Sequence, residues 1–302
     1  MQSFQRTLWI FIAGAAALAG VLGWAVARQG LAPLRTMRDQ TNAVTAQHLS
    51  YRLPVHTMPL ELVELAQSLN AMLTRLEDAF VRLSAFSSDI AHELRTPVSN
   101  LMTQTQVALS KVRDADAYRS ILESNAEEYE HMARMISDML LLAKAENGLM
   151  VPAKETTDLA AEFRALFDYY EAVADEKAVG FALHGTGSVP ADRLMLRRAL
   201  GNLLSNAIRH ATPGTRIDVS LANTPQAFEI RVQNTGEAIA PEHRERVFER
   251  FFRVDPSRQR SSEGTGLGLA ITKSIVLAHG GTISAASSGA VTTFTMVLPH
   301  AG

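Results

Sequence analysis

Residues 86–100 of the chain read FSSDIAHELRTPVSN, within a longer stretch whose apolar residues recur at helical spacing. Ile90 and Leu94 mark the face expected to be buried, and His92 lies two positions from each of them. Two residues span about 200° around an α-helix, so the sequence predicts that His92 faces solvent. Pro97 is expected to bend the helix one turn later, because its ring clashes with the carbonyl four residues earlier. A solvated histidine is usually only a surface residue, but the adjacent bend makes this one a candidate functional group.

The pattern around His92 predicts one arm of a helical hairpin, and a second helix returns after it. The returning helix has a seam at alternating spacings of four and three, formed by Tyr118, Leu122, Asn125, Tyr129, Met132, Ile136, Met139 and Ala143. Met132, Met135 and Met139 of this helix could suggest a soft-metal site, but their helical spacing favours core positions. Gly148 suits the end of this helix. One hairpin of this size cannot bury two such faces, so residues 81–150 are predicted to form a dimeric four-helix bundle.

Residues 8–27 form an apolar run without a formal charge, LWIFIAGAAALAGVLGWAVA. A helix of this length spans about 30 Å, the thickness of a bilayer core, and the run is longer than the apolar region of a typical signal peptide. The sequence therefore predicts a retained transmembrane helix over 8–27, with residues 1–7 as a short extracytoplasmic stub. More arginines follow the run than precede it, which predicts that the rest of the chain is cytoplasmic.

Residues 28–80 are predicted to form two helices with a polar connector between them. Pro33 suits the first turn of a helix over about 31–47, and Pro54 and Pro59 interrupt the pattern after it. The second helix has a seam at spacings of three and four, formed by Leu62, Leu65, Leu69, Met72 and Leu76. This spacing is typical of a coiled coil, although an ordinary buried helix face has it too.

From about residue 155 the pattern changes, and short strands alternate with helices. Helices are expected over 159–177, 193–210 and 267–279, and strands around 179–183, 217–221, 228–232, 282–285 and 293–298. Short hairpin-linked strands with helices grouped between them predict an α/β sandwich over 155–302, with its helices on one face.

The composition excludes several classes of function. The 302 residues include 29 basic and 31 acidic side chains, a formal net charge of −2, so the chain lacks the basic character of nucleic-acid-binding proteins. It contains no cysteine, which excludes disulfide scaffolds, thiolate zinc sites and cysteine nucleophiles. We therefore expect no nucleic-acid partner.

Two segments of the C-terminal half carry residues suited to an anionic ligand. Asn202, Asn206 and Arg209 share one face of the expected helix, because steps of four and three separate them. An amide oxygen can coordinate Mg²⁺ and a guanidinium suits phosphate, although a merely solvated polar face is an equal alternative. Residues 264–269 read GTGLGL, and glycines at a helix start let the backbone approach an anion. This is neither a Rossmann turn, since no strand precedes it, nor a P-loop.

Together and in this order, these segments resemble the sensor histidine kinases of bacterial two-component systems. FSSDIAHELRTPVSN is similar to their H box, NLLSNA (202–207) to the N box, QNTG (233–236) to the G1 box, FERFF (248–252) to the F box and GTGLGL to the G2 box. Residues 28–80 resemble the HAMP relay domain. The resemblance implies that 155–302 have the ATP-binding fold shared with gyrase and Hsp90. In the detail of the residues in and around these boxes, the chain most resembles the heavy-metal (copper/silver-type) branch.

The resemblance implies an ATP:protein-histidine phosphotransferase that uses ATP and Mg²⁺. His92 would accept the γ-phosphoryl group, Glu93 would hold or take its proton, and Thr96 would position water for dephosphorylation of a regulator. Asn206 would bind Mg²⁺. The remaining residues implied in nucleotide binding are Asn202, Arg209, His210, Asn234, Gly236, Arg260, Gly264, Thr265, Gly266, Leu267 and Gly268. The implied partners are a second copy of the chain, the aspartate of a response regulator and the lipid bilayer of the bacterial inner membrane, with the catalytic portion cytoplasmic.

Two features depart from the family pattern. The G1 box has Asn234 and Ala238 where most relatives have Asp and Gly, and the Asn234 amide can still accept a hydrogen bond from adenine, without charge. Family members also carry two membrane spans around a periplasmic sensor, whereas this chain begins just before the expected second span. Met1 is therefore interpreted as an internal methionine of a longer reading frame, and the sequence does not identify the signal.

Two other classes of function stay open. The altered G1 box is compatible with an ATP-binding membrane scaffold, or with a phosphatase that has no kinase activity. An ATPase of the gyrase or Hsp90 type is a further alternative, but it leaves the hairpin with His92 without a purpose. Acid-labile phosphate on His92 would distinguish the kinase from both.

Overall fold

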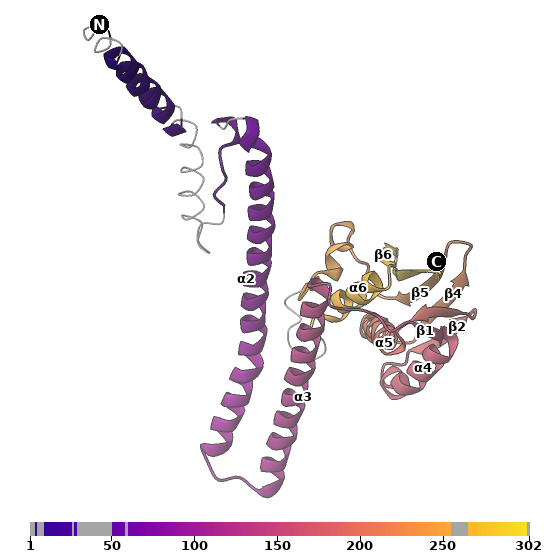
Figure 1. Ribbon diagram of the computed structural model, residues 1–302. Helices are drawn as coiled ribbons and strands as arrows, with labels where there is room; N and C mark the ends of the chain where they lie inside the picture. Colours follow the sequence, from indigo (N-terminus) through magenta and orange to yellow (C-terminus); the bar gives the residue numbers. More distant parts are fainter. Residues whose placement is uncertain are drawn as a thin grey trace. The chain divides into compact units, whose positions relative to one another are not determined.

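The computed structural model describes residues 4, 9–25, 27–28, 50–57, 60–254 and 265–300, and the chain divides into two compact units, Met1–Arg95 and Thr96–Gly302. In the first unit, residues 9–25 and 27–28 are helical (Figure 1). Their side chains are exposed, including those of Trp9 and Trp24. In the part of the chain that the structure describes, no helix is both long and apolar enough to cross a membrane. The predicted transmembrane helix over 8–27 is therefore not confirmed by the structure.

The segment before the long helix α2 (Leu60–Leu109), described over residues 50–57, packs against the first turns of that helix. Leu53 is buried against Ala66, together with the partly buried Val55, Leu62 and Leu69. The Leu53 backbone N–H donates to Asn70 Oδ1 at 2.9 Å, and Asn70 Nδ2 donates to the Leu53 carbonyl at 3.0 Å. The short helix η1 (Val55–Thr57) lies within this segment. The helix expected over 31–47 lies outside the described residues.

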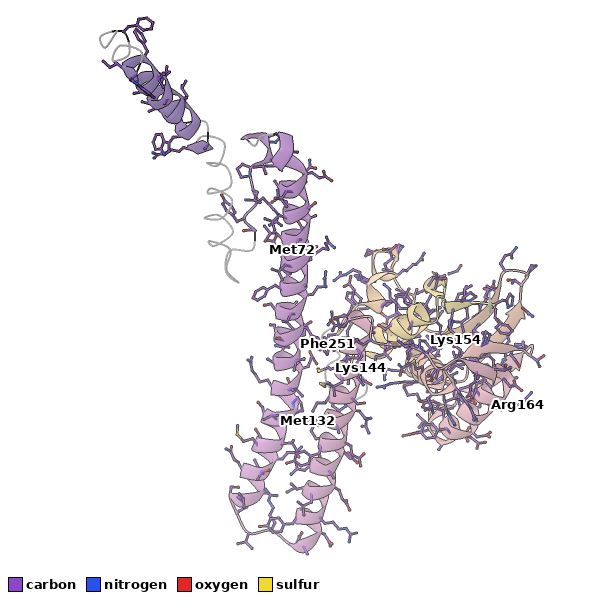
Figure 2. The ribbon with its side chains drawn as sticks, viewed as in Figure 1. Met72, Met132, Lys144, Lys154, Arg164 and Phe251 are labelled. Atoms are coloured by element: carbon purple, nitrogen blue, oxygen red, sulfur yellow. The ribbon has the colours of Figure 1, made fainter. Side chains whose placement is uncertain are left out.

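The seam predicted along the first part of α2 is only partly covered within this chain. Leu65, Met72 and Leu76 are 54%, 52% and 50% exposed, and Figure 2 labels Met72 on α2. Apolar side chains at coiled-coil spacing gain little while water surrounds them. This part of the seam is uncovered in the single chain, and its packing against another helix stays a prediction.

The second arm of the hairpin is α3 (Ala115–Glu146), which follows α2 after a short turn. Asp114 caps it, because the carboxylate accepts a hydrogen bond from the Ala117 backbone N–H at 2.7 Å and so satisfies a donor that the first turn leaves unpaired. Gly148 has φ +66° just beyond the helix, which confirms its predicted role at the end of this arm. α2 itself continues through Pro97 as one helix.

In the second unit, the hairpin buries some of its apolar residues and exposes others. Met135 and Met139 are buried, as are Leu101 and Leu142, which confirms the predicted core position for these two of the three methionines. Met132 is half-buried. By contrast, a further set stays exposed: Val98, Met102, Leu109, Leu122, Tyr129 and Ile136.

The C-terminal part is an α+β fold built on a five-stranded sheet of order β2-β4-β5-β7-β6 (Figure 1). Its strands are β2 (Gly180–His184), β4 (Arg216–Asn223), β5 (Ala227–Thr235), β6 (Thr282–Ser288) and β7 (Val291–Pro299). β2 and β4 are parallel and the other neighbours are antiparallel. The helices are α4 (Leu159–Glu176), α5 (Arg193–His210) and α6 (Gly268–Ala278). Burial alternates along β4, β5 and β7, as expected for a sheet with one covered face.

This domain has a well-filled core between the sheet and the helices. Phe163 of α4, Phe228 of β5 and Phe294 of β7 are among its largest fully buried side chains. Full burial of a side chain of this size contributes about 1.5–3 kcal/mol. Two short helices, η2 (Pro241–His243) and η3 (Arg246–Phe248), follow β5.

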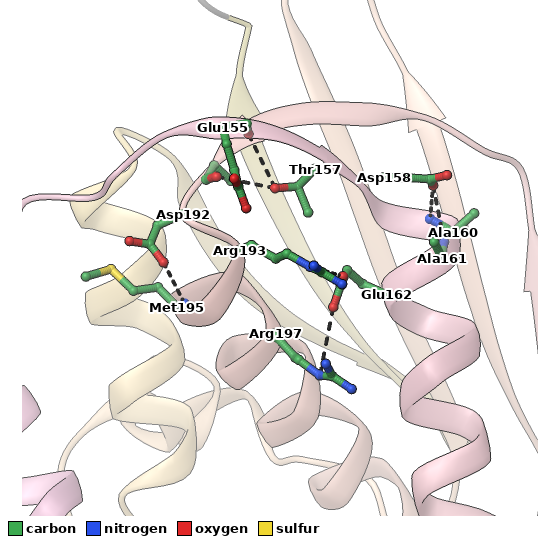
Figure 3. A network of polar contacts seen from close by, with 11 residues as sticks. Glu155, Thr157, Asp158, Ala160, Ala161, Glu162, Asp192, Arg193, Met195 and Arg197 are labelled. Atoms are coloured by element: carbon green, nitrogen blue, oxygen red, sulfur yellow. Dashed lines mark hydrogen bonds and ion pairs between the residues drawn. The ribbon is translucent and has the colours of Figure 1, made fainter.

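A small second sheet and a polar network join the starts of α4 and α5. β1 (Glu155–Asp158) pairs antiparallel with β3 (Ser188–Ala191), and the sequence analysis had not predicted either strand. Figure 3 shows Glu162 of α4 between two arginines of α5; its carboxylate lies 2.6 Å from Arg193 Nε and 3.8 Å from Arg197 Nε. These contacts fix the N-terminal end of α5, the helix that carries Asn202 and Asn206.

Asp192 caps the N-terminus of α5, and its replacement tests how much this cap stabilises the helix. Its carboxylate accepts hydrogen bonds from the backbone N–H groups of Met195 at 3.0 Å and Ala153 at 3.1 Å. These hydrogen bonds, above all the one from Met195, lower the pKa of Asp192 from its usual value of 3.8. We expect D192A to destabilise α5 by about 1 kcal/mol, as loss of a helix cap usually does.

Because the pKa is lower in the folded state, the charge stabilises the fold above pH 3.8, and this contribution is lost as the pH falls through the folded-state pKa. D192N keeps a capping oxygen but does not titrate. The difference between wild type and D192N in amide hydrogen exchange of α5 should therefore be full near neutral pH and shrink as the pH falls below 3.8. A difference that is constant over this range would contradict the assignment.

Candidate active site

A cavity of about 550 Å³ lies in the second unit, between α4, α5, the segment after β5 and the start of α6. Its walls combine apolar side chains, such as Ile208, Ile239 and Phe294, with amides and cations. Pockets of this size, mostly apolar with a few converging polar groups, are typical of small-molecule binding sites.

One wall of the cavity is the polar face of α5. Asn202, Asn206, Arg209 and His210 all line it, so the structure brings together the four residues that the sequence analysis placed on or next to this face. Asn202 is also used within the protein, because its Nδ2 donates to the Gly268 carbonyl at 3.0 Å. This hydrogen bond therefore links α5 to the start of α6, at the end of the glycine-rich segment.

The glycine-rich segment supplies a second wall. Thr265, Gly266 and Gly268 line the cavity, whereas Leu267 is fully buried in the core. Gly266 has φ +69°, and a Cβ there would lie 2.8 Å from the Cα of Phe251, which Figure 2 labels. Glycine is therefore required at this position for close packing. Arg260 and Gly264 lie outside the described residues.

Asn234 and Gly236 come from the end of β5. Asn234 lines the cavity, is only 3% exposed, and its Nδ2 has no hydrogen-bond partner. Gly236 does not line the cavity. A Cβ at Gly236 would lie 1.9 Å from the His210 carbonyl oxygen, and its N–H donates to the Ala290 carbonyl at 2.7 Å. Gly236 therefore shapes the site by letting the segment after β5 pass close to the end of α5.

The structure also brings residues to the cavity that sequence reasoning missed. Three of them, His131, Arg134 and Asp138, come from α3. Burial raises the pKa of Asp138, although its ion pair with Arg198 of α5 opposes this shift. The three α3 residues are separated by three and four positions, so they lie on one face of the helix. This shared polar face could have been recognised from the sequence.

Two more missed residues come from the end of α4. Lys177 and Tyr170 line the cavity, and Lys177 Nζ donates to the Arg209 carbonyl at 3.4 Å. Burial raises the pKa of the Tyr170 hydroxyl, with a further increase from Tyr169 and an opposing effect of Arg209. The hydroxyl is therefore neutral at physiological pH and can donate a hydrogen bond.

The histidine of the FSSDIAHELRTPVSN stretch lies in α2. His92 is exposed, in agreement with its predicted orientation, and Glu93 is half-buried. Both belong to the first unit, whereas Thr96 is the first residue of the second and is exposed. An exposed imidazole on a helix is accessible for attack on a substrate.

The donor set of the cavity fits a nucleotide with its phosphates. The apolar walls suit a base, the Asn234 amide suits the edge of that base, and Arg209 and Lys177 suit phosphate oxygens. Within the described ranges there is no group of three or more His, Cys, Asp or Glu side chains that could hold a metal. Mg²⁺ usually keeps several waters and binds through few protein ligands together with substrate phosphates, so the Asn206 amide is compatible with it.

Comparison with known proteins agrees with this geometry. The chain matches the HAMP domain over 25–78, the His Kinase A (phospho-acceptor) domain over 82–148 and the Histidine kinase-, DNA gyrase B-, and HSP90-like ATPase family over 191–302. It is 48% identical over 275 residues to the sensor histidine kinase CusS of Escherichia coli O157:H7, covering 91% of this chain and 57% of that protein. It is 46% identical over 289 residues to the probable sensor protein PcoS of Escherichia coli, covering 96% and 62%. The chain thus spans about three fifths of these relatives.

A solved structure also resembles this one. The histidine kinase AdeS of Acinetobacter baumannii aligns with a TM-score of 0.59 at 25% identity, over 70% of this chain and 98% of that chain.

Proposed function

Because the chain belongs to the sensor histidine kinase family, in the branch that includes CusS and PcoS, we propose that it transfers the γ-phosphoryl group of ATP to His92. The observation that carries this proposal is the cavity in which Asn202, Asn206, Arg209 and Asn234 converge, in a chain that also presents His92 exposed on α2.

In the proposed reaction, a ring nitrogen of neutral His92 attacks the γ-phosphorus in line with the bond to the leaving oxygen. A P–N bond forms, the P–O bond to the β-phosphate breaks, and ADP leaves. The proton on the other ring nitrogen passes to Glu93, the neighbouring carboxylate. Asn206 would hold Mg²⁺ through its amide oxygen, and the ion would offset the negative charge of the phosphates.

The other polar residues of the cavity would bind and orient the nucleotide. Arg209 and Lys177 would contact phosphate oxygens, and Asn234 would contact the adenine edge. Asn202 would act in part through Gly268, because their hydrogen bond fixes the glycine-rich start of α6 beside the nucleotide. The helix N-terminus at Gly268 adds a partial positive charge there.

The proposed partners are a second copy of the chain and a response regulator. The exposed apolar residues of the hairpin support a dimeric four-helix bundle, since a second hairpin would cover them. A receiver aspartate would then take the phosphoryl group from His92. The uncharged run over 8–27 supports attachment to the bacterial inner membrane, with the remainder cytoplasmic. The similarity to CusS and PcoS supports a role in a heavy-metal response.

The test of this function is phosphoryl transfer to the protein itself. Purified chain incubated with Mg²⁺ and γ-labelled ATP should gain label that is stable in base and lost in acid, as expected for a P–N bond. Omission of Mg²⁺ should reduce the label to background. Label that resists acid, or none at all while ATP binds, would contradict the kinase proposal.

A second candidate function is dephosphorylation of the regulator. Thr96 lies four residues after His92 in α2 and is exposed, a position suited to orienting water next to a docked phospho-aspartate. The Asn234 and Ala238 departures keep a phosphatase or ATP-binding scaffold without kinase activity as the alternative. Loss of regulator dephosphorylation in T96A, with autophosphorylation retained, would support the phosphatase activity.

A further inference from the structure

Helix α3 of the hairpin supplies a wall of the cavity from outside the ATP-binding fold. His131, Arg134 and Asp138 line the same cavity as the polar face of α5. Steps of three and four separate these three residues, so they form one face of α3. A ligand in the cavity therefore meets side chains of the hairpin as well as those of the ATP-binding fold.

Two ion pairs hold α3 against the ATP-binding fold. Asp138 pairs with Arg198 of α5, and Glu146 Oε1 lies 2.5 Å from Arg250 Nη2. α3 also packs against α6. The first ion pair fixes α3 beside α5 one turn after Arg134. It also offsets the negative charge of Asp138, which would otherwise repel an anion from this wall.

The pairing of Arg134 within α3 is weak. Arg134 Nη1 lies 3.6 Å from the Glu130 carboxylate, and both side chains are exposed. Exposed pairs of this kind contribute little, so a phosphate could replace the carboxylate at small cost. The planar fork of a guanidinium suits phosphate oxygens. His131 is half-buried on the same wall, and its imidazole can donate a hydrogen bond to a further oxygen.

The two ends of the cavity differ in exposure, and this difference indicates which part of ATP lies next to α3. At the end formed by β5 and β7, Asn234, Thr292 and Phe294 are all buried. At the α3 wall, Arg134 is exposed and His131 is half-buried. Charged groups are costly to bury, so the phosphates favour the α3 wall and the base favours the enclosed end.

Resting on the proposed ATP site, we propose that His131 and Arg134 bind phosphate oxygens of ATP from α3. Bound ATP then contacts the hairpin and the ATP-binding fold at once, and it adds to the Asp138–Arg198 ion pair that holds the two together. By linkage, the hairpin strengthens ATP binding and ATP stabilises the contact of α3 with α5 to the same extent.

The test is titration calorimetry of ATP, with Mg²⁺ present, on the full chain and three variants. R134Q should bind ATP about tenfold more weakly than wild type, as expected for the loss of one hydrogen bond to a charged group. H131A should bind about fivefold more weakly. R119Q is the matched control, because Arg119 also forms an exposed ion pair within α3, with Glu123, but does not line the cavity. Its affinity should equal that of wild type.

Hydrogen exchange separates contact with ATP from a general effect on the helix. Exchange of the backbone amides over residues 131–138 should slow when ATP saturates wild type or R119Q, and should slow less in R134Q. Wild-type affinity in both R134Q and H131A would overturn the inference, as would equal losses in R134Q and R119Q. Exchange in α3 that ATP leaves unchanged in wild type would overturn it without any variant. Failure of wild type to bind ATP would instead overturn the proposed function itself.

Discussion

Replacing His92 with alanine is expected to reduce the acid-labile label to background. The substitution removes the ring nitrogen that forms the P–N bond, and the chain has no cysteine that could act as a nucleophile in its place. The measurement is incorporation of γ-labelled phosphate into wild type and H92A under identical conditions. His92 is exposed on α2, so no buried contact is lost and the fold should be retained.

A second histidine provides the matched control. His56 is exposed in η1, within the same unit of the chain, and H56A should incorporate as much label as wild type. ATP affinity measured separately should be similar in H92A and wild type, so that lost label reflects lost chemistry rather than lost substrate. Acid-labile label that persists in H92A would place the phospho-acceptor on another histidine.

The sequence predicted those elements whose signals are local. α5 was predicted with the bounds Arg193–His210 that the structure shows, and the Asp192 cap directly before it is a local signal of the same kind. β4, β5 and β7 alternate in burial, and all five strands of the main sheet were predicted within a few residues of their observed ends. β1 and β3 were missed because each has four residues, and Pro190 within β3 argues against a strand.

In the candidate site, too, the residues that share a local pattern were predicted and those brought together by tertiary packing were not. Asn202, Asn206 and Arg209 lie on one helix, so their spacing alone predicted that they converge. Leu267 could not be separated from its neighbours by sequence, because only the tertiary packing sends its side chain into the core. Lys177 and the α3 residues reach the cavity from elements that are distant in sequence. The spacing of the α3 residues shows that they share a helix face, but only the tertiary structure shows that this face borders the cavity.

Replacing Asn206 with alanine is expected to have the second large effect, a loss of about 100-fold or more in the rate of autophosphorylation. Asn206 lines the cavity on the face of α5 that it shares with Arg209, and its amide oxygen is the proposed protein ligand of Mg²⁺. Without it, the charge of the phosphates would be less well offset as the phosphoryl group moves. The measurement is the initial rate of labelling as a function of Mg²⁺ concentration, which should require far more Mg²⁺ for half-maximal rate in N206A.

Asn202 is the informative comparison, because it lies one turn earlier on the same face but donates to the Gly268 carbonyl. N202A should loosen the glycine-rich start of α6 and weaken ATP binding, while the Mg²⁺ concentration for half-maximal rate stays close to that of wild type at saturating ATP. Hydrogen exchange at the start of α6 should increase in N202A and not in N206A. If N206A has the Mg²⁺ dependence of wild type, the metal is held by another group, and the two asparagines would then share only a role in shaping the cavity.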